Sequence, residues 1–246
     1  MTPVQRIQQN VLAANERRLL NWICARLPIW VKPDQLTAIG FSGSCLSSAG
    51  YVLSNWNPAW LFLAIAGYFI NWFGDSLDGS LARYRNIERP EYGYFLDHSV
   101  DSFANMILVI GIGLSPYVEL RFALLGLIGY LLMSIHTFLA ARVMGEFRLS
   151  YLSGGPTELR LVLIAMTSCM LGFGPAPFFS TGFSVFDVFV IVIALVLITL
   201  YLVQTFQTAR ILLKPVHRET PPSPLHVVPL VPPSTEPDRA QKQNQN

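Results

Sequence analysis

Four aspartates stand in two pairs, and a short polar stretch separates the pairs. Asp75 and Asp78 are three residues apart, and Asp97 and Asp101 are four apart. On a helix, either spacing puts both carboxylates on one face. Four carboxylates that converge without partners repel one another, whereas Mg²⁺ or Mn²⁺ binds such hard oxygen ligands and relieves the repulsion. The pattern predicts a metal site in which two ions could hold a diphosphate.

Small and basic residues accompany these aspartates. Three small residues, which would let a nucleotide approach the backbone closely, follow the first pair: Gly79, Ser80 and Ala82. Arg83 is suited to hold phosphate oxygens through two parallel hydrogen bonds. Gly93 lies one turn before Asp97 on the same stripe. We therefore expect a phosphate-bearing nucleotide next to the acidic pairs.

The segments that must position these residues are apolar. Of the 246 residues, 52% are hydrophobic and 13% are charged, whereas soluble domains carry about a quarter charged residues. The net charge of +2 is too small to favour nucleic-acid binding. Stretches long enough to cross a bilayer predict six transmembrane helices, at about 34–54, 58–78, 94–116, 121–142, 159–174 and 185–212. Backbone groups in lipid must pair within their own segment, so we expect an all-α integral membrane protein.

The basic residues indicate the orientation of these spans. With six spans, every Lys and Arg except Arg121 falls on one side of the membrane. The positive-inside rule places that side in the cytoplasm, together with both termini. We therefore expect a multi-pass protein of the cell inner membrane or an equivalent membrane.

The segments on either side of the spans differ in character. Within 1–31, hydrophobic residues recur at helical spacing among arginines, which predicts an amphipathic N-terminal helix at the cytoplasmic interface, with a solvated helical extension as the alternative. The transmembrane catalytic domain is expected over 32–214. The polar, proline-rich segment 215–246 is expected to be a disordered cytoplasmic tail.

The acidic region also fits a known pattern. The run "DSLDGSLAR", nine residues and then "GYFLDHSVD" resemble the signature of the CDP-alcohol phosphotransferases, D-x2-D-G-x2-A-R, a spacer and G-x3-D-x3-D. Eight residues fill all eight positions: Asp75, Asp78, Gly79, Ala82, Arg83, Gly93, Asp97 and Asp101. The spacer after Arg83 is one residue longer than the commonest form. The opening "KPDQLTAIG" of the first span is also similar to the family's entry to that span.

The resemblance implies an activity and a role for each signature residue. A substituted phosphate would pass from a CDP-linked donor to an alcohol, with release of CMP and formation of a phospholipid. Asp75, Asp78 and Asp97 would be ligands of two Mg²⁺ or Mn²⁺ ions. Asp101 would be a ligand of the second ion and also the general base. The CDP moiety would contact Gly79, Ala82, Arg83 and Gly93. The family also implies six transmembrane helices, an N-terminal amphipathic helix and a homodimer.

The substrates remain open between two groups. "LDHSVDS" and "GGPTE" resemble segments of the enzymes that take a CDP-amino alcohol (choline or ethanolamine) and diacylglycerol, which we favour. The alternative is CDP-diacylglycerol with a small polar alcohol such as glycerol phosphate, serine or an inositol. A cation transporter with an acidic site is the alternative from another class, although such sites usually lie near the bilayer midplane.

Further charged and polar residues lie outside the signature. Arg142, Arg148, Glu158 and Arg160 either only orient the protein or line the same cytoplasmic cleft and hold a head group. Arg85 and Arg89 are interpreted as ordinary cytoplasmic loop charges. His98 and His136 are expected to be packed or hydrogen-bonded helix residues rather than metal ligands.

Overall fold

The computed structural model describes residues 5–7, 13–144, 146–148, 156–175, 177 and 182–213. Within these ranges it contains seven α-helices: α1 (Ala13–Cys24), α2 (Pro33–Leu53), α3 (Leu61–Tyr84), α4 (Pro90–Gly113), α5 (Leu120–Met144), α6 (Pro156–Phe173) and α7 (Val185–Leu212). A 3-10 helix, Pro58–Trp60, precedes α3. Two three-residue strands, β1 (Gln5–Ile7) and β2 (Glu146–Arg148), pair in parallel. Apart from this pair of short strands, the regular elements of the described ranges are helices, as predicted.

Four of the helices are long and apolar enough to cross a membrane. They are α2, α4, α5 and α7, with spans at Pro33–Leu53, Pro90–Gly113, Leu120–Val143 and Val185–Leu212. Helix α3 is as long as α4 but is not among them, and the apolar part of α6 covers only Leu159–Phe173. The chain is therefore an integral membrane protein, with four of the six predicted spans supported by length and composition.

Two helices extend further beyond the acidic pairs than the hydropathy pattern predicts. Helix α3 continues six residues past the predicted end at 78, and α4 begins four residues before 94, with Pro90 in its first turn. Hydropathy marks where apolar residues stop, whereas a helix continues through polar residues until a turn breaks it. Asn86, with φ 56°, provides that turn, since asparagine tolerates the left-handed region. The aspartates therefore lie inside regular helix, where their spacing is fixed.

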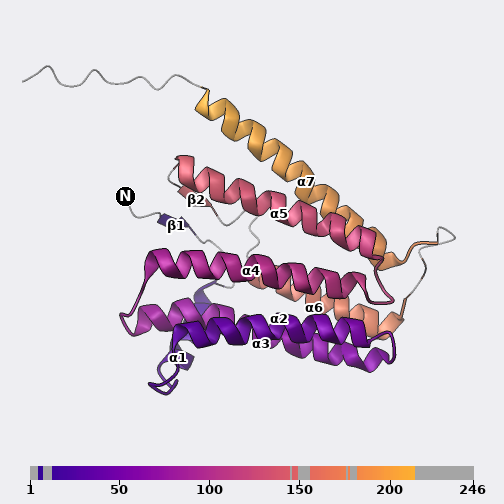
Figure 1. Ribbon diagram of the computed structural model, residues 1–246, viewed down its shortest axis with the longest axis horizontal. Helices are drawn as coiled ribbons and strands as arrows, with labels where there is room; N and C mark the ends of the chain where they lie inside the picture. The colour runs from indigo at the N-terminus through magenta and orange to yellow at the C-terminus, as the bar shows by residue number, and fades with distance from the viewer. Residues whose placement is uncertain are drawn as a thin grey trace, which may run out of the picture.

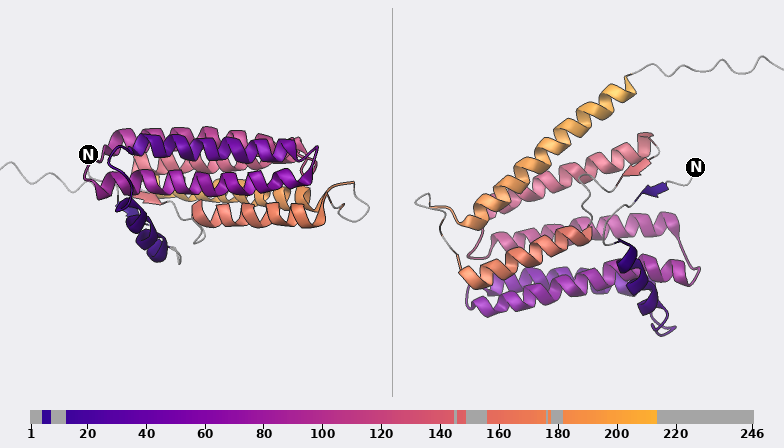
Figure 2. Two further views of the ribbon diagram at one scale, coloured as in Figure 1. Left: turned by 90° about the horizontal axis from the view of Figure 1, so that it is seen from below. Right: turned by 180° about the vertical axis from the view of Figure 1, so that it is seen from behind.

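The helices form two groups with α4 between them (Figure 1). Helices α2 and α3 are antiparallel neighbours, α4 packs on α2, and α6 packs on α3, while α5 and α7 form a second pair whose chains run in the same direction. The end of α3, the start of α4 and the end of α5 lie at the same end of the molecule. At that end α1 crosses the bundle at a steep angle, as both views in Figure 2 show.

Glycines allow α2 and α3 to approach each other closely. A Cβ atom on Gly74 would lie 2.2 Å from the backbone nitrogen of Gly40, and one on Gly43 would lie 2.4 Å from the backbone nitrogen of Asn71. Such distances are too short for any side chain. In lipid there is no hydrophobic driving force between helices, so their association depends on close packing, which small residues at the interface allow. Helices α2 and α3 are consequently packed in close backbone contact, and α3 carries the first acidic pair.

Helix α1 is attached to the bundle through a small apolar cluster of six residues: Leu20, Cys24, Val31, Leu36, Leu77 and Leu81. The loop after α1 is held by one arginine. The Arg85 guanidinium donates hydrogen bonds to the carbonyl oxygens of Leu27 (3.0 Å), Pro28 (2.9 Å), Ile29 (3.3 Å) and Val31 (2.6 Å). Arg85 is thus a structural link between α3 and this loop, so its interpretation as an ordinary loop charge was wrong.

Candidate active site

All eight signature residues line one cavity of about 2610 Å³. The cavity lies among α3, α4, α5, α6 and α7, and residues of α1 line it as well. The four aspartates are half-buried, while Arg83 and Gly93 are exposed. The hairpin between α3 and α4 therefore brings the two acidic pairs to a common space, as their spacing predicted. The adjoining residues Ala82 and Gly79 lie on the same wall.

Asp78 is fixed by two hydrogen bonds. The Thr37 hydroxyl on α2 donates to its Oδ2 atom over 2.7 Å, and the backbone amide of Gly79 donates to its Oδ1 atom. Thr37 also reaches the carbonyl oxygen of Pro33 at 3.3 Å. Because both carboxylate oxygens have a donor, the side chain has one well-defined orientation toward the cavity.

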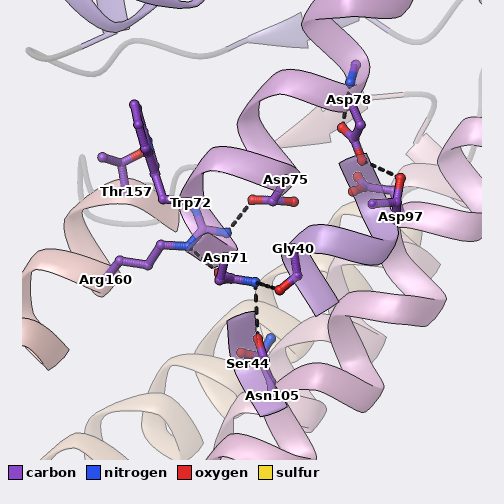
Figure 3. Close-up of polar contacts among 12 residues, drawn as sticks. Gly40, Ser44, Asn71, Trp72, Asp75, Asp78, Asp97, Asn105, Thr157 and Arg160 are labelled. Atoms are coloured by element: carbon purple, nitrogen blue, oxygen red, sulfur yellow. Dashed lines mark hydrogen bonds and ion pairs between the residues drawn. The ribbon is translucent and has the colours of Figure 1, made fainter. Parts of the chain in front are cut away.

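Asp75 takes part in a network across three helices (Figure 3). Arg160 of α6 forms an ion pair with Asp75 and donates from Nε to the side-chain oxygen of Asn71 over 2.8 Å. The amide nitrogen of Asn71 in turn donates to the Gly40 carbonyl oxygen and the Ser44 hydroxyl of α2, both at 3.1 Å. Such a network holds α2, α3 and α6 in one arrangement, and it is satisfied at each of these atoms.

The second pair lies on α4 together with a histidine. One ligand atom each from Asp97, His98 and Asp101 lies within 4.8 Å of the others, which is close enough for a shared metal ion. The His98 ring stacks on Phe138 of α5 with centroids 5.2 Å apart, and its Nδ1 atom lies 3.4 Å from Asp97. The expectation that His98 is a packed residue agrees with this contact, but His98 also belongs to the acidic cluster.

Arg83 and the small residues leave open space beside the aspartates. The Arg83 side chain is exposed and donates to the Ser80 hydroxyl at 3.3 Å. A Cβ atom on Gly79 would lie 3.3 Å from Nη1 of Arg83, and one on Gly93 would meet no atom within 4 Å. This part of the cavity can therefore take a bulky anion between an arginine and two short backbone segments.

Comparison with known proteins agrees with this geometry. A family model described as CDP-alcohol phosphatidyltransferase matches residues 30–203. The chain belongs to this family. The matched range includes α2 to α6 and most of α7, and hence all eight signature residues. The resemblance seen in the signature is thereby confirmed at the level of the family.

The relatives that match are cholinephosphotransferases and archaetidylinositol phosphate synthases. Cholinephosphotransferase 1 of Gallus gallus is 30% identical over 127 residues, which cover 45% of this chain and 38% of the relative. Archaetidylinositol phosphate synthases are 34% identical in Pyrococcus horikoshii (42% of this chain, 52% of the relative) and 32% identical in Methanothermobacter thermautotrophicus (48% and 56%). The matches thus span about half the length of these curated relatives, or less.

The sequence left the roles of the arginines near the site open, and the structure distinguishes between them. Arg160 contacts Asp75 and Asn71 and lines the cavity, so it does more than orient the protein. Arg142 lines the cavity and is exposed. The side chains of Arg148 and Glu158 lie outside the part of the structure that is described. Thr37 and Asn71, which hold Asp78 and Arg160, were missed because single polar residues in apolar spans gave no pattern.

Proposed function

We propose that this protein transfers a substituted phosphate from a CDP-linked alcohol to an acceptor alcohol and releases CMP. One observation carries the proposal: four aspartates from two antiparallel helices line the same cavity as Arg83. Membership of the CDP-alcohol phosphatidyltransferase family supports it. A cation transporter is less consistent with the site, because the cavity that the acids line also holds Arg83 and open space beside Gly93, which suit a bulky phosphate-bearing group.

The chemistry of the donor set fits two Mg²⁺ or Mn²⁺ ions. Asp75, Asp78, Asp97 and Asp101 offer only carboxylate oxygens, the ligands that these hard cations prefer. Bound ions would neutralise the diphosphate of the donor and the charge that develops on the leaving CMP. His98 is the one nitrogen donor among the described residues of the cluster.

The residues of the chain would then perform the remaining steps. Asp101 would accept the proton of the acceptor hydroxyl, whose oxygen forms the new bond to the donor's distal phosphorus while the bond between that phosphorus and the CMP oxygen breaks. Arg83 would bind phosphate oxygens, and the open space at Gly79, Ala82 and Gly93 would admit the nucleotide. The atoms balance, since the acceptor loses a proton and CMP leaves with the electrons of the broken bond.

For the substrates, we favour a CDP-amino alcohol as donor and a diacylglycerol as acceptor. Arg160 is already engaged by Asp75 and Asn71, which leaves it less suited to a phosphorylated acceptor. Apolar side chains also line the cavity and could hold acyl chains: Met133, Phe138, Val192, Val196 and Leu200. Exposed Arg142 on the same cavity favours the second candidate, CDP-diacylglycerol with a small polar alcohol.

The same proposal includes the arrangement in the membrane. We infer six spans, with α3 and α6 crossing beside the four apolar helices, and both termini in the cytoplasm of an inner or equivalent membrane. Basic residues at the end of α3 and the starts of α4 and α6 support a cytoplasmic site, where CDP-linked donors are made. We also infer a homodimer, from the family alone.

The deciding experiment is a substrate panel. Purified protein in nanodiscs would be given radiolabelled CDP-choline, CDP-ethanolamine or CDP-diacylglycerol with diacylglycerol, glycerol phosphate, serine and inositol phosphate in turn. We expect CMP release to require both a donor and an acceptor. No release with any pair would refute the proposed function. Release only with CDP-diacylglycerol would establish the second candidate.

The metal requirement is a prediction in its own right. We expect turnover to need millimolar Mg²⁺ or Mn²⁺ and to be inhibited by Ca²⁺, which takes more ligands in a looser geometry than a phosphate clamp allows. CMP release would be measured over a titration of each ion after chelation. Full turnover in excess chelator would rule out the two-metal site.

A further inference from the structure

Glu16 of α1 joins the two helices that carry the ion pair of the site. Its Oε1 atom accepts a hydrogen bond from the indole nitrogen of Trp72 on α3 over 2.8 Å and from the Thr157 hydroxyl on α6 over 3.0 Å. Glu16 is half-buried and lines the cavity. One carboxylate oxygen is thus the meeting point of three helices.

The register of these contacts relates Glu16 to Asp75. Trp72 precedes Asp75 by three residues on α3, and Thr157 precedes Arg160 by three residues on α6. Residues at this spacing are neighbours on one helix face. The same faces of α3 and α6 are therefore linked twice: through Glu16, and through the pair of Arg160 with Asp75. In Figure 3, Thr157 and Trp72 lie together while Arg160 extends toward Asp75 and Asn71.

The local electrostatics favour a carboxylate at this position. Thr157 is the second residue of α6, so the Glu16 carboxylate lies beside the N-terminus of that helix. Negative charge is stabilising there because the first amide groups carry partial positive charge. Hydrogen bonds to a charged acceptor are also stronger than those to a neutral one. Glu16 can therefore hold the start of α6 against α3.

We propose that Glu16 is a positioning residue, which keeps the start of α6 in the register that places Arg160 on Asp75. Helix α1 is then a working part of the site rather than only an interfacial anchor. The consequence for metal binding rests on the proposed function, whereas the placement of α6 by Glu16 does not. The competing explanation is that Glu16 only attaches α1 to the bundle.

Hydrogen exchange measured by mass spectrometry tests the placement of α6. The full-length protein in nanodiscs would be compared with Glu16→Ala, Glu16→Gln and Arg18→Gln. Gln keeps an acceptor oxygen, and Arg18 is an exposed residue of α1 outside the cavity. We expect faster exchange at 157–163 in Glu16→Ala only. Unchanged exchange at 157–163 would overturn the proposal. Thr157→Val, which removes a single donor, serves if Glu16→Ala does not fold.

Binding of Mn²⁺ alone, followed by electron paramagnetic resonance, tests the link to Asp75. We expect Glu16→Ala to weaken the affinity by roughly tenfold, the effect of one hydrogen bond to a charged group, and Glu16→Gln to restore most of it. In an Arg160→Gln background, Glu16→Ala should add almost nothing, because Glu16 acts through Arg160. An unchanged affinity, or an equal loss in both backgrounds, would contradict the positioning role.

The two proposals fail in different ways. A wild-type protein that neither binds Mn²⁺ nor releases CMP would refute the proposed function, and the exchange at 157–163 would still decide whether Glu16 places α6. Conversely, a wild-type protein that is active and binds Mn²⁺, with Glu16→Ala identical to it in both measurements, would overturn the role of Glu16 alone.

Discussion

Individual aspartates of the site differ in the partners that surround them, and this difference predicts different mutant behaviour. Asp78 has a donor on each oxygen and lies next to Gly79, whereas Asp101 is one helical turn beyond Asp97 and is the proposed base. We expect Asp78→Asn to lose both donor binding and turnover. Asp101→Asn should keep much of the donor affinity but lose turnover.

Calorimetric titration of a CDP-linked donor in the presence of Mg²⁺ measures the first quantity, and CMP release measures the second. A matched control is Glu119→Gln, an exposed acid directly before α5 that does not line the cavity. Equal loss of donor affinity in Asp78→Asn and Asp101→Asn would refute the division of roles.

Thr37 provides a second prediction for a single residue. Thr37→Val keeps the shape but removes the hydroxyl that donates to Asp78 over 2.7 Å. Losing a hydrogen bond to a charged group costs about 1.5–3 kcal/mol. We therefore expect the Mg²⁺ concentration for half-maximal CMP release to rise at least about tenfold. Thr37→Ser, which retains the hydroxyl, is the control and should stay near wild type. An unchanged requirement in Thr37→Val would show that Asp78 does not need this donor.

The sequence predicted the residues of the candidate site that lie close to one another along the chain. It missed those that meet only when distant helices pack together. The four aspartates could be predicted because each pair lies within one helical turn and one hairpin joins the pairs. Thr37 meets Asp78 across 41 residues, and Arg160 meets Asp75 across 85. Such contacts depend on how helices pack, which no spacing within a single segment encodes. A polar residue in an otherwise apolar span was the one available signal.

Among the helices, the contact of α2 with α3 is the most sensitive to substitution. A Cβ atom on Gly74 would meet the backbone of α2 at Gly40 and Leu36, at 2.2 Å and 2.4 Å, and backbone cannot move aside. We expect Gly74→Ala to push the helices apart, to lower stability by about 1–3 kcal/mol as overpacking does, and to lengthen the Thr37–Asp78 hydrogen bond.

Thermal unfolding in detergent and CMP release would follow this change. Gly172→Ala on α6 is the matched control, because a Cβ atom there meets nothing within 4 Å. We expect the control to unfold at the wild-type temperature or slightly above. If Gly74→Ala behaved in the same way, the close approach of α2 and α3 would not be important for stability.

Helix positions were predictable to different degrees for physical reasons. Helix α7 matches its predicted range at both ends, and Ser184 caps its start. The ends of α3 and α4 near the site were placed short, since hydropathy falls at the aspartates while the backbone hydrogen bonds continue. The glycine contacts between α2 and α3 follow a small-residue pattern that composition alone does not reveal.

For the molecule as a whole, the testable property is its orientation. The basic residues predict that 55–59 lies outside and that the turn between α3 and α4 lies in the cytoplasm. Asn57 and Glu88 are both exposed. In a background without Cys24, Cys45 and Cys169, we expect Asn57→Cys to react with an impermeant thiol reagent in intact cells. Glu88→Cys should react only after permeabilisation. Labelling of Glu88→Cys from outside would make a cytosolic site untenable.

The hydrogen bonds of Arg85 hold the backbone of the loop after α1 without using the side chains of that loop. All four of its hydrogen bonds in this loop go to carbonyl oxygens, which every amino acid possesses. Ile29 and Trp30 are 94% and 72% exposed, so their side chains are not needed to hold the loop. Positions 29 and 30 can therefore be changed, by evolution or by a protein engineer, to suit a membrane of different surface chemistry while the end of α3 that carries the first acidic pair stays where it is.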